Sequence, residues 1–234
     1  MLDYPASRRV GLQSRLVADL QHFLSTVPLF GAATDAELDS LAATAFGRLL
    51  KRGQTLVREG QPSDLLFVVV AGRLKVFVGS ERGEHLGLAM VGPGEVIGLF
   101  GIVDGQPRLA TIEALEDARL VCIPGADFHA LLQRSAGLSL AVAEELAFRI
   151  RDVTGSAADL VFLDLPRRLV KLLLATSDTN GLSLTQTEIA DQLGAARTSV
   201  NRNLSSFQRR GWVEIGHKNV RVLDREALAG FGGA

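Results

Sequence analysis

Residues 185–211 hold the side chains of this chain whose types and spacing are best suited to chemistry. Arg197 and Asn201 are four residues apart, as are Thr198 and Arg202. On a helix this spacing places the two members of each pair on one face. Arginine can donate two hydrogen bonds to guanine, and asparagine can form two with adenine. The pattern therefore predicts a helix whose exposed face reads base edges.

A helix-turn-helix motif would hold that face in place. Thr185 and Glu188 have the spacing of a capping box, which satisfies free backbone N–H groups at the start of a first helix. Ala190 is small enough for two helices to cross closely, and Gly194 supplies the turn between them. The apolar residues predicted to fill the core between the helices are Ile189, Val200 and Leu204.

A β-hairpin wing is predicted after this motif, from residues 212–215 and 219–223 around Gly216. Basic residues near the wing are placed to contact phosphates, which give affinity without sequence information. Arg210 and Arg221 belong to that basic set. The residues predicted to bind DNA are Arg197, Thr198, Ser199, Asn201, Arg202, Arg209 and Lys218.

The charge distribution agrees with a nucleic-acid partner for the C-terminal part alone. The chain has 234 residues and a net charge of −1. Residues 166–234 hold 10 Lys and Arg against 6 Asp and Glu, whereas residues 1–165 hold 15 against 20. An acidic front and a basic tail indicate that only the tail meets a polyanion.

Composition excludes several other classes of protein. One cysteine, Cys122, leaves no disulfide within a chain and no cysteine-ligated cluster, and the four histidines have no metal-ligand spacing. No apolar run approaches the ~20 residues of a membrane span, and no signal peptide is recognisable, so a cytoplasmic protein without membrane contact is expected. No catalytic set stands out, so an enzyme is not expected.

A β-rich segment is predicted over about residues 46–123. Short runs alternate with glycine, at residues 55–58, 65–70, 74–78, 86–91, 96–100 and 109–123. Glycine permits tight corners, so these runs predict hairpins wound into a β-roll or barrel, with no helices interleaved. Two helices are predicted before it: a short one at residues 13–27, and one begun by a capping box at Thr34 and Glu37.

A long helix is predicted from Ala136 to about Asp164. Its apolar residues recur at steps of three and four, which is the seam of a two-stranded coiled coil, although one amphipathic helix lying on its own domain would give a similar pattern. Pro166 cannot continue that helix but suits the start of another, so a hinge is placed at residues 164–166. The dimer-interface residues predicted on the seam are Leu146, Ile150, Val153, Ala157 and Leu160.

Three segments in order resemble the cyclic-AMP receptor protein / fumarate-nitrate regulator (Crp/Fnr) family. Residues 60–72 resemble the early strands of that family's β-roll, residues 98–110 its phosphate-binding cassette, and residues 196–202 its recognition helix. The resemblance implies an α+β fold: a cyclic-nucleotide-binding-type β-roll effector domain with N-terminal helices (residues 1–135), a dimerisation helix and hinge (136–165) and a winged helix-turn-helix (166–234). It also implies a homodimer that binds a palindromic site in double-stranded DNA, and an activator would contact RNA polymerase as well.

The effector site departs from the family's pattern. Arg108 stands where the family pairs an arginine with the cyclic phosphate, but Leu99 replaces the glutamate that accepts from the ribose, and Leu109 replaces a small hydroxyl residue. Of the two hydroxyl residues that touch adenine in the receptor, only one is kept, at Thr154 beside Val153. A ribose hydroxyl facing leucine loses a partner at a cost of about 1–3 kcal/mol. The effector-binding candidates are Gly98, Leu99, Arg108, Leu109, Val153 and Thr154.

Cyclic AMP is therefore not the expected effector, and no cofactor is required by any motif. Three alternatives for the effector remain: another nucleotide such as a cyclic dinucleotide, an apolar molecule, or no ligand at all. Arg108 has a structural alternative, a salt bridge to Asp104 or Glu113. On the DNA side, the resemblance matches Arg197 and Arg202 to the family's base-reading arginines and puts Thr198 in place of a glutamate. The alternative function is a nucleotide-binding sensor or scaffold that acts through protein partners instead of DNA.

Overall fold

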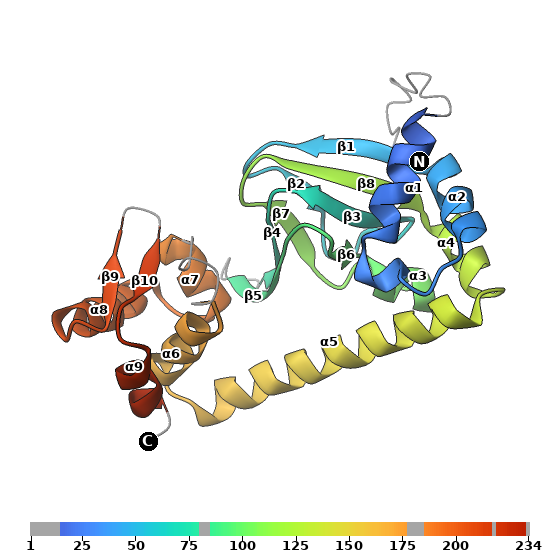
Figure 1. The fold of residues 1–234 in the computed structure, drawn as a ribbon. Helices are drawn as coiled ribbons and strands as arrows, with labels where there is room; N and C mark the ends of the chain where they lie inside the picture. Colours follow the sequence, from blue (N-terminus) through green and yellow to red (C-terminus); the bar gives the residue numbers. More distant parts are fainter. Residues whose placement is uncertain (1–14, 80–84, 177–184, 217–218, 233–234) are drawn as a thin grey trace. The chain divides into compact units, whose positions relative to one another are not determined.

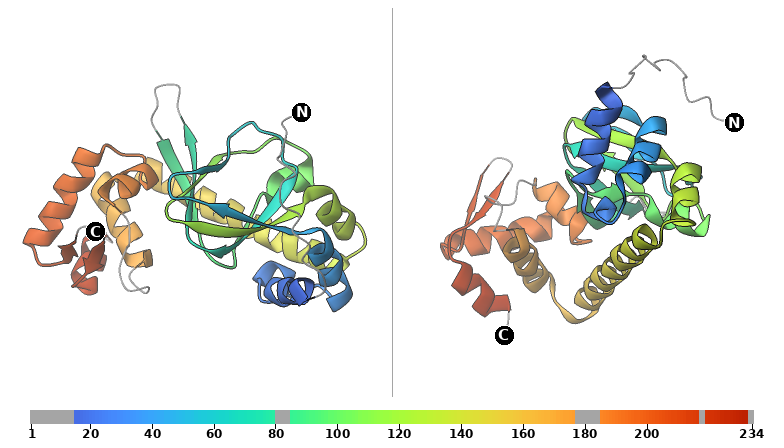
Figure 2. Two further views of the ribbon diagram at one scale, coloured as in Figure 1. Left: turned by 90° about the horizontal axis from the view of Figure 1, so that it is seen from above. Right: turned by 45° about the vertical axis from the view of Figure 1, so that its right-hand side comes forward.

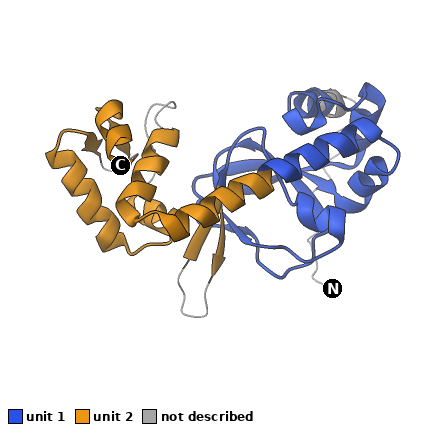
Figure 3. Ribbon diagram, turned by 90° about the horizontal axis from the view of Figure 1, so that it is seen from below, with its two compact units in different colours: residues 1–75, 90–148 blue, residues 76–89, 149–234 orange. Residues whose placement is uncertain are grey.

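The structure is a computed structural model that describes residues 15–79, 85–176, 185–216 and 219–232. It divides into two compact units, residues 1–75 with 90–148, and residues 76–89 with 149–234 (Figure 3). Mixed helices and strands confirm the predicted α+β class, with a β-roll, a long helix and a C-terminal helix-turn-helix.

The β-roll consists of two four-stranded sheets. One has the order β1-β8-β3-β6 and the other β2-β7-β4-β5 (Figure 1). The pairings of β1 with β8, β8 with β3, β3 with β6 and β2 with β7 are antiparallel. The strands are β1 (Phe46–Leu50), β2 (Thr55–Val57), β3 (Leu65–Ala71), β4 (Leu74–Gly79), β5 (His85–Val91), β6 (Val96–Ile97), β7 (Thr111–Ala114) and β8 (Ala118–Pro124).

Helices α1, α2 and α4 gather at one end of the roll (Figures 1 and 2). The helical elements of this part are α1 (Arg15–Ser25), the 3-10 turn η1 (Pro28–Phe30), α2 (Asp35–Thr44), α3 (Leu99–Asp104), α4 (Gly125–Leu132) and α5 (Ala136–Phe162). The capping box predicted at Thr34 and Glu37 is present. Phe30 and Phe128, both buried, meet edge to face with ring centroids 6.1 Å apart. Such packing buries the apolar side of the helices against β3 and β8.

Two sequence expectations about the roll were wrong in detail. The run at residues 96–100 ends as a strand at Ile97, because Gly98 adopts φ 98° and the chain then turns into α3. A helix therefore does interleave with the strands. The run at residues 109–123 is two strands, β7 and β8, not one.

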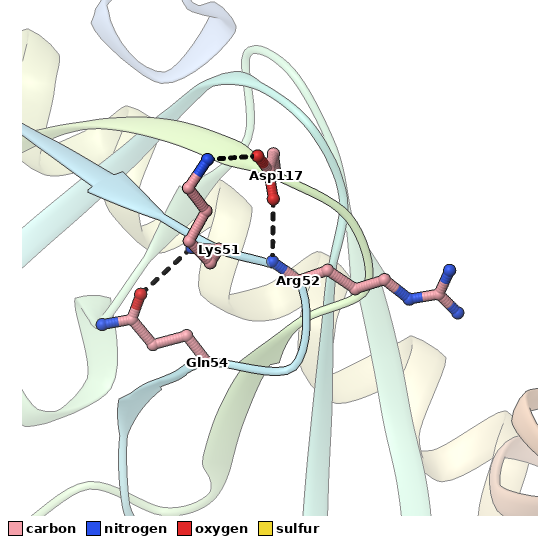
Figure 4. A network of polar contacts seen from close by, with 4 residues as sticks. All are labelled: Lys51, Arg52, Gln54 and Asp117. Carbon is pink, nitrogen blue, oxygen red and sulfur yellow. Dashed lines mark hydrogen bonds and ion pairs between the residues drawn. The ribbon is translucent and has the colours of Figure 1, made fainter.

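A polar network joins two turns of the roll (Figure 4). The ammonium of Lys51 donates to Asp117 Oδ2 at 2.7 Å, and the backbone N–H of Arg52 donates to the other oxygen of that carboxylate at 3.0 Å. The hydrogen bond between the two side chains raises the pKa of Lys51 and lowers that of Asp117. Both side chains are exposed, so this pair aligns the turns and contributes little to stability.

The C-terminal part begins where α5 ends. Asp164 Oδ1 accepts from the backbone N–H of Arg167 at 3.0 Å, so its carboxylate helps to start the next helix, whose first turn contains Pro166. Pro166 thus lies in the first turn of a new helix, as the sequence suggested for a proline that cannot continue α5. The elements are α6 (Leu165–Thr176), α7 (Gln186–Gln192), α8 (Arg197–Arg209), β9 (Val213–Ile215), β10 (Val220–Val222) and α9 (Arg225–Gly232).

An aromatic cluster closes the core of this part. The rings of Phe207, Trp212 and Phe231 lie within 5.6–5.8 Å of one another. The guanidinium of Arg210 lies 4.8 Å from the centre of the Trp212 ring. These contacts hold α8, the wing and α9 together.

Candidate nucleic-acid interface and effector site

The helix-turn-helix forms as the sequence predicts. The Thr185 backbone N–H donates to Glu188 Oε2 at 2.6 Å, and the Glu188 N–H donates to Thr185 Oγ1 at 3.2 Å. Gly194 turns the chain with φ 56°. The residues expected to fill the core between α7 and α8 are buried: Ile189, Ala190, Val200 and Leu204.

Burial on one side of α8 decides which side chains face outward. Arg197, Thr198, Arg202 and Arg209 are exposed. Ser199 is half-buried. The outward set thus presents three guanidinium groups and one hydroxyl, the groups that can donate to guanine and to phosphates.

Asn201 is less exposed than Arg197, the residue four positions earlier that was predicted to share its DNA-facing side. It is half-buried, and its amide oxygen is enclosed and has no hydrogen-bond partner among the described residues. Arg197, its partner at i,i+4, is exposed. A role for Asn201 in reading adenine therefore stays a prediction that requires the side chain to turn.

Asn203 is half-buried and forms a hydrogen bond within its own helix. Its Nδ2 donates to the Ser199 carbonyl oxygen at 2.9 Å, one helical turn back. This bond satisfies one of the two N–H donors of the half-buried amide within the helix itself.

The basic residues around the wing have separate surroundings. Strands β9 and β10 pair antiparallel, with Arg221 opposite Glu214, whose carboxylate lies 3.7 Å from the guanidinium. Arg209 is exposed at the end of α8. Arg210 lies over Trp212, which orders its guanidinium. Lys218, also predicted to bind DNA, lies outside the described residues.

Arg108 is a buried cation inside the β-roll, only 6 % exposed. Its Nη2 donates to the Leu65 carbonyl oxygen at 2.6 Å, and its guanidinium carbon lies 5.2 Å from the centre of the Phe67 ring. A Cβ atom added at Gly98 would lie 2.3 Å from Nη1. The group is therefore held between a backbone carbonyl, an aromatic face and a glycine that leaves it room.

The two carboxylates considered as structural partners of Arg108 are engaged elsewhere. Asp104 accepts from the backbone N–H of Gln106 at 2.9 Å, and Glu113 lies 3.2 Å from the ammonium of Lys75. Leu65 and Phe67 carry no sequence signal of this contact, because nothing in their types shows that β3 runs beside an arginine that follows Leu65 by 43 residues.

The two leucines of the cassette point in different directions. Leu99 is buried in the apolar core of the roll, together with Ile102 and Phe128. Leu109 is 58 % exposed. Leu99 is thus a core residue in this structure, and neither leucine offers a hydrogen-bond acceptor beside Arg108.

Helix α5 carries the other predicted contacts. The hydroxyl of Thr154 donates to the Ile150 carbonyl oxygen at 2.7 Å, so it is already used within the helix. Along the predicted seam, Leu146 packs partly against the core of the roll. The rest of the seam is exposed: Ile150, Val153, Ala157 and Leu160.

Two further properties concern the described residues only. Among them, no group of three or more His, Cys, Asp or Glu side chains could hold a metal ion. No helix among them is long and apolar enough to cross a membrane.

The chain's cysteine, Cys122, is buried. Burial raises the pKa of its thiol to about 12, so the thiol stays protonated at neutral pH.

Comparisons with known proteins match both parts of the chain. The family described as the cyclic nucleotide-binding domain matches residues 47–135, and the family described as the Crp-like helix-turn-helix domain matches residues 167–231. A CRP-like cAMP-activated global transcriptional regulator of Mycobacterium tuberculosis is 31% identical over 188 residues, which are 76% of this chain and 84% of that protein.

Two more relatives extend this likeness. The cyclic AMP receptor protein of Thermus thermophilus is 29% identical over 205 residues, 86% of this chain and 94% of that protein. A crystal structure of a regulator of the Crp/Fnr family from Eubacterium rectale has a TM-score of 0.74 at 24% identity and covers 88% of this chain and 98% of its own, a likeness that concerns the fold alone.

The closeness of Gly98 to Arg108 gives a stability prediction. Replacing Gly98 by Ala should destabilise the protein by about 1–3 kcal/mol more than replacing Gly105 by Ala. Both glycines have positive φ, 98° at Gly98 and 70° at Gly105, so both changes carry backbone strain, and it is larger at Gly98. In addition, a Cβ at Gly98 collides with the Arg108 guanidinium, whereas nothing lies within 4 Å of a Cβ at Gly105. Urea unfolding of the two variants measures the difference. Equal losses would show that neither the larger φ at Gly98 nor its contact with Arg108 constrains the fold.

Proposed function

Because the chain belongs to the Crp/Fnr family of transcription regulators, we propose that it acts as a homodimer that binds a palindromic site in double-stranded DNA. The observation that carries the proposal is the exposed face of α8. There Arg197, Thr198 and Arg202 face outward from a helix whose opposite side is buried in a helix-turn-helix core. Such a helix fits the major groove.

The division of work among the basic residues follows from their positions. Arg197 and Arg202 lie in the first half of α8, where a recognition helix meets base edges, and we assign them to guanines. Thr198 discriminates less than a glutamate would, so one base pair of each half-site is weakly specified. Arg209, at the far end of α8, is assigned to a phosphate.

Dimerisation is proposed through α5. The helix is 27 residues long, and its exposed large apolar side chains include Ile150, Val153 and Leu160, which continue the seam of Leu146. Exposed apolar residues repeating at three and four positions are costly in water and are buried when two such helices pair. Two recognition helices would then meet half-sites one DNA turn, about 34 Å, apart.

The β-roll is proposed to hold a small-molecule effector at Arg108. A buried guanidinium with its own carbonyl partner can form a charge-assisted pair with an anionic group. Cyclic AMP is not proposed, although the relatives from Mycobacterium tuberculosis and Thermus thermophilus are named for it. Here Leu99 lies in the core, and the Thr154 hydroxyl bonds its own helix.

As a regulator of transcription the protein would act in the cytoplasm, and an activator would contact RNA polymerase.

Arg197→Ala should abolish site-specific binding while leaving the fold intact, because it removes a bidentate contact with a base. Sites are first selected from random duplex DNA by the unchanged protein, and affinity is then measured by fluorescence anisotropy. The comparison variant is Arg209→Ala, which should weaken binding to all sequences alike and lower the salt slope by about one. Retained site preference in Arg197→Ala would refute the assignment and favour a partner other than DNA.

Leu160→Asp should convert the dimer to a monomer, because it puts a charge into the proposed seam. Light scattering at micromolar concentration gives the mass. The matched control is Ala158→Asp, an exposed position of the same helix off the seam. An unchanged mass for Leu160→Asp would show that the seam is not the interface.

Cyclic AMP should leave the melting temperature of the protein unchanged at concentrations that saturate cyclic-AMP receptors. A ligand of the folded state stabilises it by about 2.7 kcal/mol at a hundredfold excess over its dissociation constant. Cyclic GMP and cyclic dinucleotides are scanned in the same way, and Arg108→Ala should cancel any shift that one of them produces. A clear upward shift with cyclic AMP would contradict the pocket argument.

A further inference from the structure

Arg168, in the first turn of α6, bonds the turn of the helix-turn-helix (α6, α7 and α8 in Figure 1). Its Nη1 donates to the carbonyl oxygen of Leu193 at 2.7 Å. Leu193 is the C-terminal capping residue of α7, and Gly194 after it turns the chain toward α8. All of these residues belong to the same compact unit. A guanidinium from a neighbouring helix therefore holds the turn of the DNA-binding motif.

The end of α7 leaves the Leu193 carbonyl to a donor from outside the motif. The last carbonyl groups of a helix have no partner within it. At this turn the backbone N–H groups of residues 193–195 donate to the carbonyl oxygens of residues 189–191. Among the described residues, no backbone N–H donates to the Leu193 carbonyl. Arg168 thus supplies a hydrogen bond that the turn does not make for itself.

The charge of Arg168 suits the end of α7 better than its own helix. A cation in the first turn of α6 faces the positive end of that helix dipole, whereas at the C-terminus of α7 it meets the negative end. The backbone N–H of Arg168 donates to the Asp164 carbonyl oxygen at 3.1 Å, which fixes the base of the side chain. Arg168 is therefore placed to stabilise α7 and its turn.

The contact satisfies only part of the guanidinium. Nε of Arg168 is enclosed and has no hydrogen-bond partner among the described residues. An enclosed donor without a partner costs free energy, and an apolar side chain of similar length would avoid that cost. Stability alone therefore does not account for an arginine at this position, which indicates a role in geometry.

The start of α8 depends on the turn that Arg168 holds. A capping box begins α7, but the N-cap residue of α8 is Ala196, which has no polar side chain. Arg197 and Thr198 are the first two residues of α8 and follow Leu193 closely, so little chain lies between to absorb a shift of the turn. Binding groups must be held within roughly 0.5 Å of their productive positions. A displaced turn would therefore displace the side chains assigned to bases.

We propose that Arg168 is a positioning residue for DNA recognition: its bond to the Leu193 carbonyl fixes the turn between α7 and α8, and with it the approach of Arg197 to a base. The inference rests on the proposed function. It adds a residue outside the helix-turn-helix that decides how sharply the motif distinguishes its site from other sequences.

Arg168→Met tests the proposal. Methionine is a flexible apolar side chain that adapts to the space but cannot donate to the Leu193 carbonyl. Fluorescence anisotropy of the whole chain gives its affinity for the selected duplex and for a random duplex of equal length. The ratio of the two affinities should fall roughly tenfold, within the range of one lost base contact. Affinity for the random duplex and its salt slope should stay unchanged, because the residues assigned to phosphates are untouched.

The affinity ratio separates positioning from a purely structural role. Loss of folded protein would weaken binding to both duplexes by the same factor and leave the ratio unchanged. The matched control is Arg225→Met, since Nη1 of Arg225 also donates to a backbone carbonyl, that of Leu174 on α6, at 3.3 Å. That bond does not involve the turn, so this variant should keep the full ratio.

A second readout needs no DNA. Hydrogen exchange of the backbone amides of residues 193–195 should be faster in Arg168→Met than in Arg225→Met, since the turn loses its anchor. Arg168→Gln covers the case in which Arg168→Met fails to fold. Its amide is polar, but the side chain is two atoms shorter and stops short of the Leu193 carbonyl, so both readouts should change in the same direction.

An unchanged affinity ratio in both Arg168 variants, with Arg197→Ala still losing site preference, would overturn the positioning role and leave the proposed function standing. Equal losses on both duplexes, or the same fall of the ratio in Arg225→Met, would also overturn it. If Arg197→Ala keeps full site preference, the proposed function fails, and the exchange experiment alone then decides whether Arg168 orders the turn.

Discussion

The burial of one face of α8 is the constraint on which the function of this chain depends. Val200, Leu204 and Phe207 follow one another at steps of four and three and are all buried. Packing of that stripe against α7 and in the aromatic cluster fixes the rotation of α8 about its axis, and so fixes which of its residues face outward. Arg197, Thr198 and Arg202 must point outward, and they are the donors that a base-reading helix needs.

The same constraint separates residues that look equivalent in sequence. Asn201 neighbours the buried stripe, so its amide oxygen is enclosed, whereas Arg202 stands clear. Asn203 is also half-buried, and its amide bonds the Ser199 carbonyl. The angle of a polar residue from the core therefore decides whether it faces outward, bonds its own backbone or carries an unsatisfied atom.

A second buried charge organises the β-roll. Arg108 costs free energy to bury, and the Leu65 carbonyl and the face of Phe67 offset part of that cost, although Nε and Nη1 are buried with no hydrogen bond among the described residues. Around it the usual polar environment of a nucleotide site is thin, since Leu99 belongs to the core and Leu109 faces outward. Arg108 supplies a cation for an anionic group, but neither leucine side chain can bond a ribose hydroxyl. This combination supports our proposal that the chain shares the fold of the family but does not use cyclic AMP as its effector.

The sequence by itself determined the local elements: both capping boxes, the break at Gly194, the start of a helix at Pro166 and the apolar stripe of α8. Each depends on side chains a few residues apart, whose interactions the chain order already fixes. It also determined the family, because three motifs stand in the required order. It missed α3, because residue type alone does not show which glycine will adopt the left-handed φ that turns the chain from a strand into a helix. Only the tertiary structure decided the neighbours of Arg108 and the enclosure of Asn201. Those contacts join residues distant along the chain, and residue types alone do not say which distant strands and helices will pack together.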